Sequence, residues 1–152
     1  MKKTKVLVIE DEGIMALALI RKLEKFGYDI PFTISSGEEA IQMAEKIHFD
    51  LILMDIVLEG EMDGIEAASI ICELHHVSVI YLTANSDLTI FKRAKATHPA
   101  GFILKPFDEE QLQATMNMAI YKSRIQKSSA SENVNDMIES ERYYIKPIVH
   151  NF

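Results

Sequence analysis

Several polar residues in this chain of 152 residues directly follow short apolar runs. They are Glu10, Asp11 and Glu12 after residues 6–9, Asp55 after residues 51–54, Thr83 after residues 77–82, and Lys105 after residues 102–104. Carboxylates that lie close together repel one another unless a cation lies among them. Because the set offers oxygen ligands and contains neither Cys nor His, it favours a hard cation such as Mg²⁺.

Each of these residues also has a simpler interpretation. An acid after a strand is commonly a helix cap or a solvated loop residue. A Thr or a Lys-Pro pair at the end of a strand is equally ordinary. The combination still favours a site, because Asp55 directly follows a run that is wholly apolar.

The apolar runs predict the strands that would position these residues. There are five, at residues 6–9, 28–34, 51–54, 77–82 and 102–104. Three of them are nearly continuous in Val, Ile and Leu, which is typical of strands buried on both faces. Helical spacing predicts helices at residues 13–26, 38–47, 65–74, 88–96 and from Asp108 to about residue 125.

This alternation predicts an α/β fold, a parallel sheet with helices on both faces. In open sheets of this kind, functional groups gather beyond the carboxyl ends of the strands. The polar residues described above all lie at such ends. We therefore expect them to share one pocket.

Charge and composition exclude other classes of function. The chain has 16 Lys and Arg against 23 Asp and Glu, a net charge of −7, which argues against direct contact with nucleic acid. No run approaches the roughly 18 apolar residues of a membrane span, so we expect a cytoplasmic protein without membrane contact. One cysteine, Cys72, excludes an intramolecular disulfide. Residues 10–12 and 55–63 hold seven acids and no base, so the net charge is formally that of two loops.

The motifs, in this order, resemble those of the receiver domain of two-component response regulators. The matching segments are Val6-Leu7-Val8-Ile9-Glu10-Asp11-Glu12, Leu51-Ile52-Leu53-Met54-Asp55-Ile56, Met62-Asp63-Gly64, Leu82-Thr83-Ala84 and Gly101-Phe102-Ile103-Leu104-Lys105-Pro106-Phe107. The resemblance covers about residues 4–124. It implies a flavodoxin-like, doubly wound sheet of five parallel strands in the order 2-1-3-4-5, with five helices.

The resemblance implies a role for each site residue. Asp55 would be the phosphoacceptor, whose carboxylate attacks a phosphohistidine. Asp11, Asp55 and the backbone carbonyl of Val57 would hold Mg²⁺, with Glu10 acting mainly through a bound water. Lys105 would pair with one phosphoryl oxygen.

The resemblance also implies a conformational switch. Thr83 would donate its hydroxyl to a phosphoryl oxygen and move toward it, and Phe102 would turn into the space vacated. The surface changed would comprise residues 88–96, the strand 102–104 and the helix 108–125. Pro106 is expected to follow a cis peptide bond.

Partners and domain limits follow from the same resemblance. The phosphoryl donor would be a sensor histidine kinase or a phosphotransfer protein, and the output would pass to a downstream effector protein or domain. The surface that switches would also allow a homodimer. Residues 1–125 would form the receiver domain, and residues 126–152 a linker or tail of unknown role, since residues 126–135 are polar and Ser-rich.

The residue two positions past Asp55 bears on how long the phosphoryl group would persist. Val57 stands two residues past Asp55, where receiver domains influence the water that hydrolyses the acyl phosphate. A valine side chain cannot hydrogen-bond that water, so we expect a long-lived phosphoryl state.

Residues 14–20 are apolar on more than one helical face. Either this helix packs snugly through Ala16 and Ala18, or Ile14 and Leu17 dock on the helical bundle of the kinase.

Two other functions remain open. A Mg²⁺-dependent phosphohydrolase resembling the haloacid dehalogenases would also use an aspartyl nucleophile. It would need a second Asp two residues later, where Val57 stands, so we expect no turnover on external substrates. A degenerate receiver would act only as a protein-interaction module, although the complete set of acids, Thr83 and Lys105 argues against it.

Overall fold

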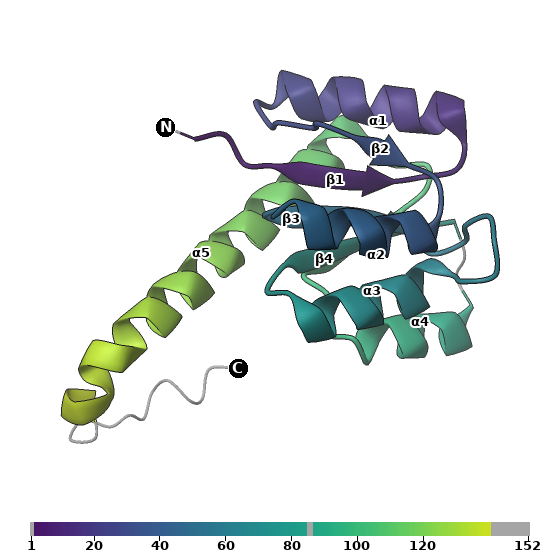
Figure 1. The fold of residues 1–152 in the computed structure, drawn as a ribbon. Helices are drawn as coiled ribbons and strands as arrows, with labels where there is room; N and C mark the ends of the chain where they lie inside the picture. The colour runs from purple at the N-terminus through teal and green to yellow at the C-terminus, as the bar shows by residue number, and fades with distance from the viewer. Residues whose placement is uncertain (1, 85–86, 141–152) are drawn as a thin grey trace. The chain divides into compact units, whose positions relative to one another are not determined.

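The protein is built around a sheet of five parallel strands (Figure 1). The computed structural model describes residues 2–84 and 87–140, with side chains as far as residue 126. The strands are β1 (Val6–Ile9), β2 (Thr33–Ile34), β3 (Leu51–Asp55), β4 (Ser78–Thr83) and β5 (Gly101–Leu104). Their order is β2-β1-β3-β4-β5, which confirms the predicted topology.

Five helices alternate with the strands. They are α1 (Gly13–Lys25), α2 (Gly37–Lys46), α3 (Gly64–Leu74), α4 (Leu88–Lys95) and α5 (Glu109–Ser140). Side-chain caps fix where four of them begin, because Ser36, Asp63, Asp87 and Asp108 each accept a hydrogen bond from a backbone N–H of the first turn. Gly27, at a φ of +97°, follows the end of α1, where a side chain would be strained.

Side chains alternate between the two faces of the sheet and create two apolar layers. Leu7 and Ile9 of β1 pack with residues of α2, α3 and α4 on one face. Val6 and Val8 pack with residues of α1 and α5 on the other. This arrangement follows from the period of two along a strand, and it fixes the register that brings the strand ends together.

The predicted strand over residues 28–34 was wrong in extent. Only Thr33 and Ile34 form β2, with a separate bridge between Asp29 and Lys5. Pro31 lies between them, and it has no N–H to donate to a sheet ladder. The strand therefore begins only after the proline.

The last helix is longer than predicted. α5 continues to Ser140, through the segment that was expected to be a linker. Residues 109–140 contain neither Pro nor Gly, so no residue interrupts the helical hydrogen bonds. The chain divides into two compact units, Met1–Ile120 and Tyr121–Phe152. The first contains all the site residues, and residues 141–152 of the predicted tail lie outside the described residues.

Across the described ranges, no helix combines the length and the apolar character that crossing a membrane requires.

Candidate functional site

The carboxyl ends of the strands surround an acidic cleft, as the sequence predicts. Its volume is about 500 Å³. The lining residues are Glu10, Asp11, Glu12, Asp55, Val57, Ala84 and Lys105. The parallel register that pairs Ile9 with Met54 places the ends of β1 and β3 side by side, so Glu10, just after β1, lies beside Asp55, the last residue of β3.

Three carboxylates in this cleft are close enough to share one cation. Glu10, Asp11 and Asp55 each offer an oxygen, and these atoms lie within 4.8 Å of one another. Glu10 and Asp55 are buried, at 4% and 5% exposure. A donor set made only of oxygens fits Mg²⁺ or a similar hard cation.

Lys105 supplies the positive charge of the cleft. Its Nζ donates to Oε1 of Glu10 at 2.7 Å and to Oδ2 of Asp55 at 2.8 Å. Its side chain is 12% exposed, so both ion pairs are largely shielded from water. The peptide bond between Lys105 and Pro106 is cis, as expected.

Burial and these ion pairs shift the pKa of Glu10 and the pKa of Lys105. Burial raises the pKa of Glu10; the hydrogen bond from Lys105 opposes this, and Asp55 adds to it. Burial alone would lower the pKa of Lys105, but its hydrogen bonds to Asp55 and Glu10 outweigh that effect and raise it. Lys105 is therefore held in its charged form, and the Glu10 carboxylate depends on that charge.

The junction between β3 and α3 holds Asp55 in place. Oδ1 of Asp55 accepts a hydrogen bond from the backbone N–H of Val57 at 3.1 Å. The N–H of Gly64 donates to the carbonyl of Ile56 at 2.8 Å. A Cβ at position 64 would overlap the backbone carbonyl of Asp55, so only glycine allows α3 to begin this close to the strand.

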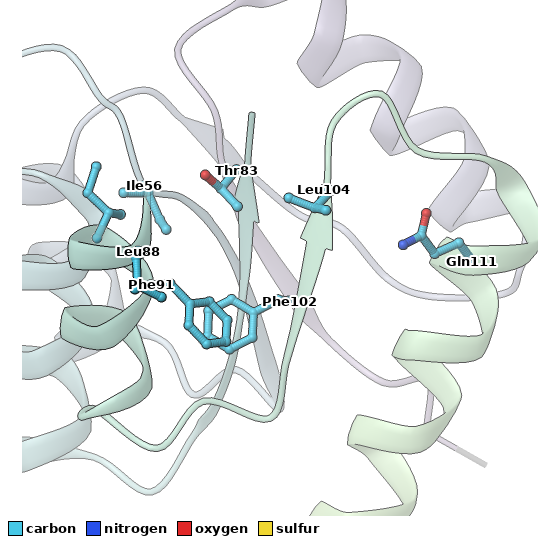
Figure 2. A pocket seen from close by; sticks show the side chains of 8 residues that line it. Ile56, Thr83, Leu88, Phe91, Phe102, Leu104 and Gln111 are labelled. Atoms are coloured by element: carbon cyan, nitrogen blue, oxygen red, sulfur yellow. The ribbon is translucent and has the colours of Figure 1, made fainter. Parts of the chain in front are cut away.

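Thr83 and Phe102 lie beside the acidic cleft, in a second cavity of about 320 Å³. Figure 2 shows Thr83 at the end of its strand, with the rings of Phe91 and Phe102 close together nearby. The ring centroids of Phe91 and Phe102 are 4.8 Å apart, and that of Tyr81 lies 5.8 Å from Phe102. Phe102 is half-buried in this arrangement.

The structure thus brings most, but not all, of the predicted site residues into one cleft. Glu10, Asp11, Asp55, Val57 and Lys105 line the acidic cleft, whereas Thr83 and Phe102 line the neighbouring apolar cavity.

Sequence analysis missed two aromatic partners of Phe102. Tyr81 is paired with Phe102 in the register of β4 and β5, and Phe91 contacts it from α4. Counting back from the strand ends at Thr83 and Leu104 would have matched Tyr81 with Phe102, since parallel neighbours keep a constant offset. The contact of Phe91 depends on how α4 packs, which has no such signal.

The comparisons with known proteins agree with this geometry. The family model for the response regulator receiver domain matches residues 6–117. The chain belongs to the receiver domain family of two-component response regulators. Receiver domains of this family are generally signalling modules rather than enzymes.

The curated relatives are longer regulators. The chain is 32% identical over 120 residues to the transcriptional regulatory protein PdtaR of Mycobacterium tuberculosis, covering 79% of this chain and 58% of that protein. It is 31% identical over 138 residues to the alkaline phosphatase synthesis transcriptional regulatory protein PhoP of Bacillus subtilis, covering 90% of this chain and 56% of that protein. The chain thus spans little more than half the length of these relatives.

Solved structures show the same fold. The signal receiver domain of a modulated diguanylate cyclase from Desulfovibrio desulfuricans is 34% identical, with a TM-score of 0.78, covering 82% of this chain and 99% of that one. The chemotaxis protein CheY4 of Vibrio cholerae is 26% identical, with a TM-score of 0.71, covering 78% and 99%.

Proposed function

We propose that this chain accepts a phosphoryl group on Asp55 and thereby relays a signal. One observation carries the proposal: a buried Asp55 carboxylate lies 2.8 Å from the Lys105 ammonium and shares a cleft with Glu10 and Asp11. A nucleophilic carboxylate, a fixed cation and further oxygen ligands are the parts that phosphoryl transfer needs.

The proposed step is a transfer between two side chains. A carboxylate oxygen of Asp55 forms a bond to phosphorus, and the bond from phosphorus to the imidazole nitrogen of a partner's phosphohistidine breaks. The electron pair of that bond stays on the nitrogen. Glu10, Asp11, Asp55 and the backbone carbonyl of Val57 would hold Mg²⁺, which supplies charge neutralisation on the transferred group.

Lys105 has a second role in this proposal. Its ammonium pairs with Asp55 before the transfer and donates to a phosphoryl oxygen afterwards. The phosphoryl adds roughly −1.5 to −2 charge and three acceptor oxygens, so the Thr83 hydroxyl is drawn toward it. Phe102 and the surface of α4, β5 and α5 then repack, a local change of charge with a wider readout.

The proposed partners follow from these steps. The donor is a sensor histidine kinase or a phosphotransfer protein, and the acceptor of the signal is an effector protein or domain, or a second copy docked through α4, β5 and α5. Ile14 is 88% exposed and Leu17 50% exposed at the start of α1, and Leu17 lines a cavity together with Glu10 and Asp11. These apolar side chains form the surface proposed to meet the kinase.

Intact mass spectrometry after treatment with a small phosphodonor and Mg²⁺ tests the proposal. We expect one phosphoryl adduct on the protein and none on Asp55→Asn, which keeps the shape of the side chain. Asp50→Asn is the matched control, because Asp50 immediately precedes β3 at the opposite end of the strand.

The remaining outcomes discriminate the alternatives. A protein that takes up no phosphoryl group would favour a degenerate receiver that acts only by binding partners. Catalytic release of phosphate from external phosphoesters would favour the phosphohydrolase. An adduct that persists on Asp55→Asn would place the acceptor elsewhere.

A further inference from the structure

Helix α4 is weakly attached to the apolar core. Ala94 is its one buried residue, whereas α3 buries five of its residues. Contacts of side chains outside the buried core therefore contribute much of what holds α4 in place. Phe91 contacts Phe102, and the hydroxyl of Thr97, just after the helix, lies 2.6 Å from the hydroxyl of Tyr81.

A further contact joins α4 to the segment that carries the phosphoacceptor. Nη1 of Arg93 lies 3.1 Å from Oδ2 of Asp63. Asp63 caps α3 through its other oxygen, since Oδ1 accepts from the N–H of Glu66 at 2.8 Å. The Glu66 side chain accepts from the N–H of Asp63 in return, at 3.1 Å.

Of the two ends of this ion pair, Asp63 is much the better anchored. The capping box holds it from one side, and the next residue, Gly64, is hydrogen-bonded to Ile56 beside Asp55. Arg93 belongs to the loosely attached helix. The ion pair therefore restrains α4, and the loop after β3 serves as its support.

We propose that the ion pair between Arg93 and Asp63 holds α4 in its unphosphorylated position and is released when Asp55 is phosphorylated. This inference rests on the proposed function, because α4 begins five residues after Thr83, the side chain that the phosphoryl group draws in. Motion of Thr83 acts on the start of α4, while Arg93 in the second turn opposes it. The pair thus sets how readily the switch responds.

The size of the effect follows from exposure. The side chains of Arg93 and Asp63 are 45% and 32% exposed, and pairs this accessible contribute modestly and are screened by salt. We expect loss of the pair to shift the opening equilibrium of α4 by about two- to fivefold. A shift of this size changes how readily α4 responds to phosphorylation of Asp55, but it does not fix α4 in one state.

Amide hydrogen exchange of α4 in the full chain tests this inference. Arg93→Gln removes the cation, and Asp63→Asn removes the charge while keeping a residue that caps helices well. Each change should accelerate exchange in α4 about two- to fivefold, and the double variant should exchange no faster than either single variant. Lys92→Gln, which removes the neighbouring cation on the same helix, should have no effect.

The phosphorylated protein provides the second arm. After treatment with a small phosphodonor and Mg²⁺, wild type and Arg93→Gln should exchange equally in α4. Unchanged exchange in the single variants, additive effects in the double variant, or a difference that persists in the phosphorylated protein would overturn the inference. Absence of an adduct on the wild type, checked by mass, would instead contradict the proposed function, while exchange of the untreated variants still decides whether the pair restrains α4.

Discussion

Lys105 and Asp55 form a buried ion pair of 2.8 Å at the carboxyl end of the sheet, and the same ammonium also binds Glu10. With Asp11, the cluster carries three acids and one base, a formal charge of −2 that a divalent cation would balance. The Lys105 ammonium therefore partly takes the place of a metal cation. It holds the carboxylates together and, in the proposed function, awaits the phosphoryl group.

Replacing Lys105 should affect metal binding and phosphorylation in opposite directions. Lys105→Met removes the competing charge, so Mg²⁺ should bind about tenfold more tightly. Phosphorylation by a small donor should nevertheless slow about 10- to 100-fold, because a fixed cation for the phosphoryl oxygens is lost. The chain has no tryptophan whose fluorescence could report metal binding, so calorimetry is the method of choice for measuring the affinity for Mg²⁺. Lys95→Met controls for the loss of a lysine. Weaker binding of Mg²⁺ to Lys105→Met would contradict this account.

The Val57 side chain is expected to prolong the phosphoryl state. It is 63% exposed and lines the acidic cleft, where it cannot hydrogen-bond an attacking water. Val57→Asn should lose phosphate several-fold faster, as measured by intact mass after the donor is removed. Val57→Ala separates the effect of the new polar group from that of reduced bulk. If the asparagine variant loses phosphate no faster than wild type, the hypothesis fails.

The apolar start of α1 should matter for the kinase but not for small donors. Leu17→Glu introduces a charge on a side chain that is 50% exposed, so the fold should tolerate it. Transfer from a phosphorylated kinase or phosphotransfer protein should slow at least about tenfold, since burying an unpaired carboxylate is costly. Phosphorylation by a small donor should be unchanged. Leu74→Glu, at an exposed leucine that ends α3, is the matched control, and equal loss with both donors would contradict the docking role.

Tyr81 predicts a loss of stability at high pH. Burial raises the pKa of Tyr81 from 10 to about 12. Between these values the unfolded chain loses the phenol proton first, so the free energy of unfolding falls as pH rises, by about 2–3 kcal/mol in total. Below pH 10 the phenol of Tyr81 is protonated in both the folded and the unfolded chain, so the stability that depends on this proton is fully present.

Tyr81→Phe tests this expectation. Near neutral pH the variant should be less stable by about 1 kcal/mol, because it loses the hydrogen bond to Thr97. Between pH 10 and 12 that difference should shrink and then reverse. Urea unfolding at several pH values measures it, and Tyr121→Phe, at a side chain 63% exposed, controls for the loss of a phenol. A difference that stays constant up to pH 12 would refute it.

Much of the scaffold could be predicted from local pattern. β1 has the predicted bounds because its residues are buried on both faces and therefore form one continuous apolar run. The same reasoning located β3 and hence Asp55 at its end. Pro31 shortened β2, where an edge strand has little other support, and the length of α5 was missed because a polar helix lacks an apolar period.

The finer features of the site depend on packing between distant elements. The pairing of Lys105 with both Glu10 and Asp55 depends on four neighbouring strands in register, β1, β3, β4 and β5, which the order of the motifs already implied. The contact of Arg93 with Asp63, and that of Phe91 with Phe102, depend on the position of α4. That helix buries a single residue, so the apolar pattern carries little information about where it lies.

Gly64 leaves no space between the beginning of α3 and the carbonyl of Asp55. The end of β3 and the start of α3 are consequently packed directly against each other, so any displacement of Asp55 would have to carry α3 with it. Since α3 buries five residues in the core, it is a poor candidate for motion. The described part of the chain therefore has an asymmetric construction: a firmly packed side, β3 and α3, that holds Asp55 and, in the proposed function, receives the phosphoryl group, and a side formed by α4 that a single buried residue and a few surface contacts hold in place.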